Sequence, residues 1–205
     1  MWNRIFDMEN PLMRALGAIC DLLVLNLLTV LCSLPIVTAG AALSALDDVA
    51  LRIVRGEDAG VVRPYFRALR GNLKQGVALG LIFQFAAVVL YVDYRAAASA
   101  PVLRVPVVAA AMVVGAAALY AFALQARDEN PVRVTLKNAA SLSVAYFPRT
   151  LGLLFFTVTL WLLCLRYFQI ALPVLLMFGL SLPAYIGAML FNPIFQKLEH
   201  KEEDK

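Results

Sequence analysis

Five ionisable side chains stand at or within the ends of long apolar runs, where a charge is costly enough to suggest a function. They are Asp21, Asp93, Arg95, Arg104 and Arg166. A charge at the centre of a bilayer costs about 2.5–3.5 kcal/mol on insertion scales. In the membrane topology favoured by the basic residues, all five lie near the outer boundary. There they either form an ion-paired cluster, built from Asp21, Asp93, Arg104 and Arg166, or reach water one by one.

Two amides, Asn26 and Gln84, lie nearer the middle of apolar runs. Hydrogen bonds between membrane helices average about 0.6 kcal/mol, so a buried amide can join two helices. The alternative role for such an amide is substrate binding. We expect a structural role for both side chains, and we keep substrate binding as the alternative.

The acidic pair Asp47 and Asp48 has the composition of an aspartyl site but not its geometry. Adjacent residues on a helix point about 100° apart, so their carboxylates do not converge on one atom. Asp48 lies four residues before Arg52, which favours a salt bridge on the helix surface. No Ser-His-Asp set, phosphate-binding glycine loop or H-E-x-x-H motif is present. We therefore expect that the protein is not an enzyme.

The residues that bind metals are few and scattered. Cys20, Cys32 and Cys164 lie in apolar runs without the two-residue spacing of metal or redox motifs, and they are expected to be buried free thiols. The single histidine, His200, is in a charged tail and has no second ligand nearby. The sequence predicts no metal site and no cofactor.

The composition indicates an integral membrane protein. Of the 205 residues, 62% are hydrophobic and 16% charged, and the mean hydropathy is +0.79. Soluble domains average about 45–50% apolar and about 25% charged residues. Since the basic residues flank apolar runs, the net charge of +4 favours membrane topology over nucleic-acid binding.

Hydropathy predicts one all-α transmembrane bundle over residues 1–195, followed by a charged cytoplasmic tail at 196–205. A crossing needs about 20 helical residues, because the hydrocarbon core is about 30 Å thick. Amphipathic helices at the membrane interface are predicted near 41–55, 61–75 and 131–146, although 39–55 could instead pack against the spans. The predicted spans are 15–38, 76–94, 105–126, 150–167 and 171–195.

Proline and glycine mark the places where these helices are expected to bend or meet. Pro35 disturbs the first span because it has no N–H and its ring clashes with the preceding turn. Gly76 and Gly80 form a G-x-x-x-G pattern that permits close approach of another helix. Gly179 and Pro183 make the fifth span liable to kink.

Arginine and lysine are distributed unequally over the two sides of this topology. Of the 18 basic residues, 13 lie in segments 52–74, 127–149 and the tail, whereas 5 lie on the opposite side. Cytoplasmic loops carry the excess of positive charge. The two basic amphipathic segments and the C-terminus are therefore expected in the cytoplasm of the cell, and the N-terminus outside. The 61–75 segment is expected to rest on anionic headgroups; docking of another protein is the alternative.

One stretch of the sequence resembles a known family. The runs NLLTVLCSLPIVTAGAALSAL from Asn26 and RPYFRALRGNLKQG from Arg63 are similar to YesL-like bacterial membrane proteins, a domain family of unknown function. The family has Phe where Leu69 and Leu73 stand here. The resemblance is specific over residues 26–76 and rests on hydropathy alone after residue 95. It makes Asn26, Pro35, Thr38, Gly40, Asn72, Lys74 and Gln75 the candidate motif.

This resemblance implies a multi-pass protein of the bacterial plasma membrane, encoded beside carbohydrate ABC importers, and it supplies no catalytic residue. We therefore expect a non-enzymatic accessory or scaffold component of carbohydrate ABC uptake, with permease subunits and the lipid bilayer as partners. A small transporter or channel acting on its own is the alternative. A homo-oligomer is compatible with either, and no nucleic-acid partner is expected.

Overall fold

The computed structural model describes residues 11–57, 60–99, 101–127 and 130–203. Every regular element in these ranges is a helix, which confirms the all-α prediction. In chain order they are α1 (Pro11–Ser33), the 3-10 turn η2 (Ile36–Thr38), α2 (Ala39–Arg55), α3 (Val62–Gly71), α4 (Leu73–Ala96), the 3-10 turn η3 (Ala97–Ser99), α5 (Pro101–Arg127), α6 (Val132–Ala145), α7 (Phe147–Arg166), α8 (Phe168–Phe178) and α9 (Ser181–Glu203).

Three of these helices are long and apolar enough to cross a membrane. Their apolar parts are Leu16–Ser33, Leu73–Ala96 and Val102–Arg127. The pair α6 and α7 passes the same test together, with a bend of 99° between the two helices. By length and composition the described chain thus has three candidate spans, or four if the bent pair is one span, and the five predicted spans are not confirmed.

The predicted fifth span, 171–195, is not one helix. It is divided into α8, which has 11 residues, and α9, which begins at Ser181. Eleven helical residues cover only about 16 Å, roughly half of a hydrocarbon core. The division occurs at Gly179, where the sequence predicted a kink. Helix α9 continues to Glu203, through most of the predicted charged tail.

The chain reverses direction between α1 and α2. Helix α1 ends at Ser33, earlier than the predicted end of the first span at residue 38. Pro35 and the short turn η2 follow, and α2 then packs back along α1 and α3. The disturbance expected from Pro35 is therefore a full break, because the next residues form a separate 3-10 turn.

Helix α2 is the central element, in contact with α1, α3, α4, α5 and α9. The sequence left open whether 39–55 lies at the interface or packs against the spans, and the structure places it among the other helices. Small side chains allow α2 to fit between the other helices: Ala41, Ala42 and Ala45 are fully buried. Helix packing in membranes favours such small residues, because they let two backbones approach closely.

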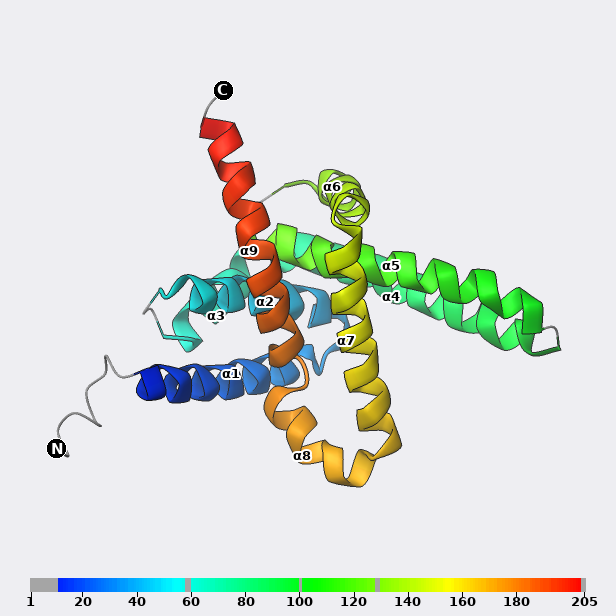
Figure 1. Ribbon diagram of the computed structural model, residues 1–205, viewed down its shortest axis with the longest axis horizontal. Helices are drawn as coiled ribbons and strands as arrows, with labels where there is room; N and C mark the ends of the chain where they lie inside the picture. The colour runs from blue at the N-terminus through cyan, green and yellow to red at the C-terminus, as the bar shows by residue number, and fades with distance from the viewer. Residues whose placement is uncertain (1–10, 58–59, 100, 128–129, 204–205) are drawn as a thin grey trace.

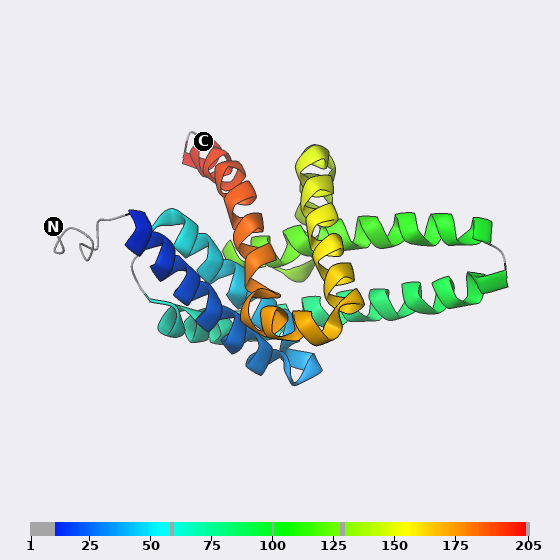
Figure 2. The same ribbon diagram turned by 60° about the horizontal axis from the view of Figure 1, so that its bottom comes forward.

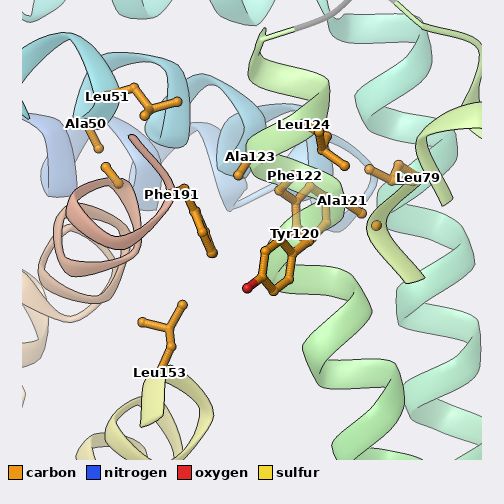
Figure 3. Packing of buried hydrophobic residues seen from close by; sticks show 12 residues of the cluster. Ala50, Leu51, Leu79, Tyr120, Ala121, Phe122, Ala123, Leu124, Leu153 and Phe191 are labelled. Carbon is orange, nitrogen blue, oxygen red and sulfur yellow. The ribbon is translucent and has the colours of Figure 1, made fainter. Parts of the chain in front are cut away.

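Two apolar clusters hold these helices together. One joins α2, α4, α5, α6, α7 and α9, and it includes the contact between Tyr120 and Phe191, with ring centroids 4.6 Å apart (Figure 3). The other joins α1, α2 and α3 around Leu25, Leu46 and Tyr65. Both clusters include α2, so its two faces connect the two halves of the core.

The α4–α5 hairpin extends away from this core, in a direction that differs from that of α7 and α9 (Figures 1 and 2). The predicted bundle of five spans side by side is therefore not the observed arrangement. The end of α5 next to α6 is buried at Tyr120 and Ala121, whereas Val105 and Val113 in its outer half are exposed. The hairpin's apolar surface suits lipid contact along most of its length.

Candidate functional site: polar side chains at two helix breaks

Asn26 on α1 is fully buried and bonds the junction between α8 and α9. Its Nδ2 donates to the carbonyl oxygens of Leu175, at 3.2 Å, and Leu176, at 2.7 Å. Its Oδ1 accepts from the backbone N–H groups of Leu180, at 2.8 Å, and Ser181, at 3.0 Å. An asparagine amide has two donor hydrogens and an oxygen with two lone pairs, so all of its bonding capacity is used.

Three of these bonds satisfy backbone groups of Leu176, Leu180 and Ser181 at the helix break, whereas the Leu175 carbonyl also accepts from the N–H of Gly179 at 2.9 Å. A helix that ends inside an apolar environment exposes carbonyls on one side and N–H groups on the other, each costly if unpaired. Gly179 fits the same junction, because an added Cβ would lie 2.6 Å from the carbonyl oxygen of Leu175. Asn26 thus makes the hydrogen bonds between helices that a structural role requires.

The break between α1 and α2 is held by one residue close to it in sequence, Thr38, and by one on another helix, Gln84. The hydroxyl of Thr38 lies 2.7 Å from the Cys32 carbonyl and 2.8 Å from the Pro35 carbonyl, so its proton can be donated to either. Gln84 on α4 donates from Nε2 to the Ile36 carbonyl at 2.9 Å. Gln84 thus also makes the predicted hydrogen bond between helices.

Three glycines let α2 and α4 cross with their backbones in direct contact. A Cβ added at Gly40 would meet the carbonyl oxygen of Gly76, and it would lie 2.5 Å from the Cα of Gly80. A Cβ at Gly80 would in turn lie 2.7 Å from the Cα of Gly40. The close approach expected of Gly76 and Gly80 is confirmed, with Gly40 as the residue that faces them.

Gln75 belongs to a second buried polar network, which joins α4, α5 and α6. The amide Nε2 of Gln125 donates to Oε1 of Gln75, and the Thr135 hydroxyl donates to Oε1 of Gln125 at 3.2 Å. Gln125 and Thr135 are both almost fully buried. Neither residue was predicted from the sequence, since each stands alone in its helix without a partner at a recognisable spacing.

A further network joins α5 to α7 near the 99° bend. The Thr150 hydroxyl lies 3.0 Å from the Tyr120 hydroxyl and 3.1 Å from the carbonyls of Ser143 and Tyr146. These contacts hold the start of α7 against α5 where the chain turns. Thr150 and Tyr120 were likewise not predicted.

The remaining motif residues lie at the junction of α3 and α4. Asn72 is buried, and its carbonyl accepts a hydrogen bond from the N–H of Gly76 at 2.7 Å. Lys74 is exposed, as are the basic side chains of α3. A surface hollow of about 480 Å³ lies beside Lys74. Its lining residues are Arg70, Gly71, Leu73, Lys74 and Gln75.

The candidate outer polar cluster is not gathered by the fold. Asp21 is on α1, Asp93 and Arg104 are at the outer end of the α4–α5 hairpin, and Arg166 ends α7. These three places are well separated in Figures 1 and 2. Two ion pairs between described residues are Asp48–Arg52, at 3.1 Å, and Arg52–Glu57, at 3.3 Å, and both lie outside this cluster.

The two acidic residues of α2 differ in their surroundings. The salt bridge predicted between Asp48 and Arg52 is confirmed; burial raises the pKa of Asp48, and Arg52 acts in the opposite direction. Asp47 makes no hydrogen bond or ion pair within the described residues. Burial without a partner raises its pKa from 3.8 to about 8. The salt-bridge or capping role predicted for the pair therefore applies to Asp48 only.

Two buried hydroxyls on the α1–α3 side of the core make no hydrogen bond of good geometry within the described residues. They belong to Tyr65, on α3, and Ser181, at the start of α9. Burial raises the pKa of Tyr65 and the nearby Thr29 hydroxyl acts in the opposite direction, so the phenol stays protonated. Both residues are fully buried, and neither lines a surface hollow.

The described residues contain no group of three or more His, Cys, Asp and Glu that could hold a metal ion. Cys20 is a free, exposed thiol, where burial was expected, and Cys32 is free and partly buried. The predictions for Cys164 and His200 lie outside the described side chains. The polar groups of the two breaks can position helices, and their geometry offers no nucleophile with an adjacent base.

The comparisons with known proteins agree with this emphasis on the first half of the chain. A family model described as "Protein of unknown function, DUF624" matches residues 22–94, from the middle of α1 to near the end of α4. No curated protein and no solved structure matches the chain. The match includes segment 26–76, on which the resemblance to YesL-like proteins rests, but does not carry that name. Residues 22–94, with Asn26, the Pro35 break and the glycine crossing, are thus similar to a domain of unknown function.

Proposed function

We propose that the protein is a non-enzymatic membrane scaffold, an accessory component of carbohydrate uptake by ABC transporters. One observation supports the scaffold role: the polar groups of the Asn26, Thr38 and Gln125 networks bond to the protein's own backbone and side chains. Groups used in this way fix helices relative to one another. The carbohydrate importer as partner comes from the family resemblance alone.

The surface of α3 suits a partner or a membrane face of negative charge. Arg63, Arg67 and Arg70 are exposed on this helix, and Lys74 follows at the start of α4. We propose that this surface and α6 lie in the cytoplasm, as does the C-terminus. With the C-terminus in the cytoplasm, an odd number of crossings places the N-terminus outside the cell. Because the chain reverses at Pro35, a reporter fused to the N-terminus is the measurement that shows whether α1 crosses the membrane.

The association is tested by crosslinking in native membranes followed by mass spectrometry. We expect crosslinked peptides from permease subunits of an ABC importer, and their loss when Arg63, Arg67 and Arg70 are changed to Glu. A variant with Lys137→Glu on α6, which also reverses an exposed positive charge, is the matched control. Crosslinks confined to copies of this chain would contradict the accessory role and favour a homo-oligomer.

The divided helix α8–α9 favours one alternative, a small transporter. Transporter sites use broken helices whose free backbone groups coordinate the substrate or ion. Here Asn26 already occupies the carbonyls and N–H groups of the break. Solute flux into liposomes that contain only this protein, abolished by Asn26→Ala, would support the transporter over the scaffold.

A further inference from the structure

A groove of about 390 Å³ runs along one face of the α4–α5 hairpin, outside the packed core. It extends from Phe83 and Ala118 toward Tyr94 and Val107, near the outer end of the hairpin. The walls are apolar or aromatic throughout, and small residues of α5 form much of one wall. The lining residues are Phe83, Ala87, Leu90, Tyr91, Tyr94, Val107, Val108, Ala111, Val114, Gly115 and Ala118.

The length of the groove matches one leaflet of a bilayer. Phe83 and Tyr94 are eleven residues apart on α4, which corresponds to about 16 Å at the rise of an α-helix. Half of the hydrocarbon core is about 15 Å. Tyr91 and Tyr94 mark one end, and tyrosines are enriched where hydrocarbon meets the headgroups. The groove therefore extends from the headgroup level to about mid-bilayer.

Arg104 places a positive charge at the tyrosine end. Its guanidinium carbon lies 5.2 Å from the centroid of the Tyr94 ring, which itself lines the groove. One nitrogen donates to the Ala98 carbonyl at 3.4 Å, a long bond. The Nε atom is shielded from solvent and has no partner within the described part of the chain. A guanidinium has five N–H donors, and the hydrogen bond to Ala98 uses one of them, so others remain for a phosphate group.

We propose that the groove and Arg104 together bind an anionic phospholipid such as phosphatidylglycerol. One acyl chain would lie between α4 and α5, and the phosphate would accept hydrogen bonds from Arg104. The positive charge beside Tyr94 decides for an anionic headgroup as the occupant's polar end, and the apolar walls decide for an acyl chain as the rest.

This site is independent of the proposed scaffold function, because it lies on a part of the hairpin that none of the buried polar networks reaches. Arg95 provides a matched control at the same end of the hairpin. It is exposed, and it ends α4 without stacking on a tyrosine within the described residues. If the groove and Arg104 form a specific lipid site, Arg104 determines the headgroup preference and Arg95 does not, although both arginines carry the same charge.

The test uses the full-length protein, stripped of lipid in detergent, with phosphatidylglycerol or phosphatidylcholine of identical acyl chains added. Native mass spectrometry measures the affinity for each. We expect the wild type to prefer phosphatidylglycerol and Arg104→Gln to weaken its binding about fivefold, equivalent to about 1 kcal/mol. Arg95→Gln should keep the preference. An equal loss of affinity for phosphatidylglycerol in both variants would contradict a specific site and indicate general attraction by positive charge.

A second variant tests the binding of the acyl chain separately, and it keeps the proposal testable if Arg104→Gln does not fold. Ala111 lines the groove and is exposed, so Ala111→Phe fills the groove without burdening the core. We expect it to weaken the binding of both lipids and to leave their ratio unchanged. Unaltered lipid binding by this variant, or crosslinks that seat a second copy against Ala111, would overturn the proposal.

Discussion

The two helix breaks of this protein solve the same problem in opposite ways. At the α1–α2 break, Thr38 bonds carbonyls three and six residues before it. At the α8–α9 break, Asn26 supplies all four bonds from a position about 150 residues away along the chain. The first break takes one further bond from outside its own segment, from Gln84 on α4 to the Ile36 carbonyl. The second is satisfied only when α1 is docked, so it couples the first helix to the last two.

The two breaks also differ in their exposure to the surroundings of the protein. The first is exposed, with Leu34 at 71% and Ile36 at 72% of their full accessible surface. The second is enclosed, and Gly179 and Ser181 are buried. A backbone group at an exposed break can find water or headgroups, whereas one in the interior depends on a protein partner. Disruption of the interior break should therefore have the larger effect.

Replacement of Asn26 is expected to have the largest effect on stability. Asn26→Leu removes four hydrogen bonds and leaves backbone groups of the α8–α9 junction unpaired in an apolar environment. Since each unsatisfied buried group costs about 1–3 kcal/mol, we expect a loss of about 3 kcal/mol or more. The measurement is thermal unfolding in detergent. Asn138→Leu, at an exposed position of α6, is the matched control and should change little.

The second largest loss of stability is expected at the glycine crossing of α2 and α4, next to the first break. Gly40→Ala adds a Cβ that would collide with the backbone of Gly76 and Gly80, neither of which can rotate away. We expect a loss of about 1–3 kcal/mol by overpacking. Gly152→Ala is the control, since nothing lies within 4 Å of its added Cβ and alanine favours a helix. Similar stability of the two variants in the same unfolding assay would refute the tight crossing.

The sequence predicted the local break better than the remote one. Pro35 and the glycine spacing at 76 and 80 are readable because their causes lie within a few residues. Asn26 was recognisable as a buried amide between helices. Its partners were not, because they are backbone groups around Gly179, which carry no side-chain pattern. Gln125 and Thr135 were missed for the same reason, as single polar residues whose partners come from other helices.

The errors in the predicted spans have a related cause. Hydropathy measures how apolar a segment is, but not whether the segment remains one helix or runs beside the others. Segment 171–195 is apolar enough for a span, yet it is divided at Gly179. The predicted outer cluster failed similarly, since the assumption of parallel spans brought Asp21 and Arg166 to one level, whereas the fold separates them.

A smaller effect is expected at the first break itself. Thr38→Val keeps the size of the side chain but removes the hydroxyl near the carbonyls of Cys32 and Pro35. We expect a loss of about 1 kcal/mol, the usual net value of one hydrogen bond. Thr38→Ser retains the hydroxyl and should recover most of this loss. If Thr38→Val were as damaging as Asn26→Leu, the distinction between a local and a remote break would be wrong.

The last prediction concerns pH and Asp47, a half-buried residue on the helix that connects both halves of the core. Its pKa is about 8 in the folded protein and 3.8 as the ordinary value. Between these values the folded state binds the proton and the unfolded state does not, so stability falls as pH rises. Asp47→Asn cannot ionise. The variant should therefore gain stability relative to the wild type as the pH is raised from 5 to 8.5.

The measurement is the melting temperature of both proteins in detergent at several pH values. The wild type should lose stability through this window more steeply than Asp47→Asn, and the difference should level off above pH 8. Asp48→Asn is the matched control. Asp48 is paired with Arg52, so its replacement removes a salt bridge and should lower stability near neutral pH. Parallel pH profiles for the wild type and Asp47→Asn would show that water or a cation reaches this carboxylate, and that the centre of α2 is less enclosed than its packing indicates.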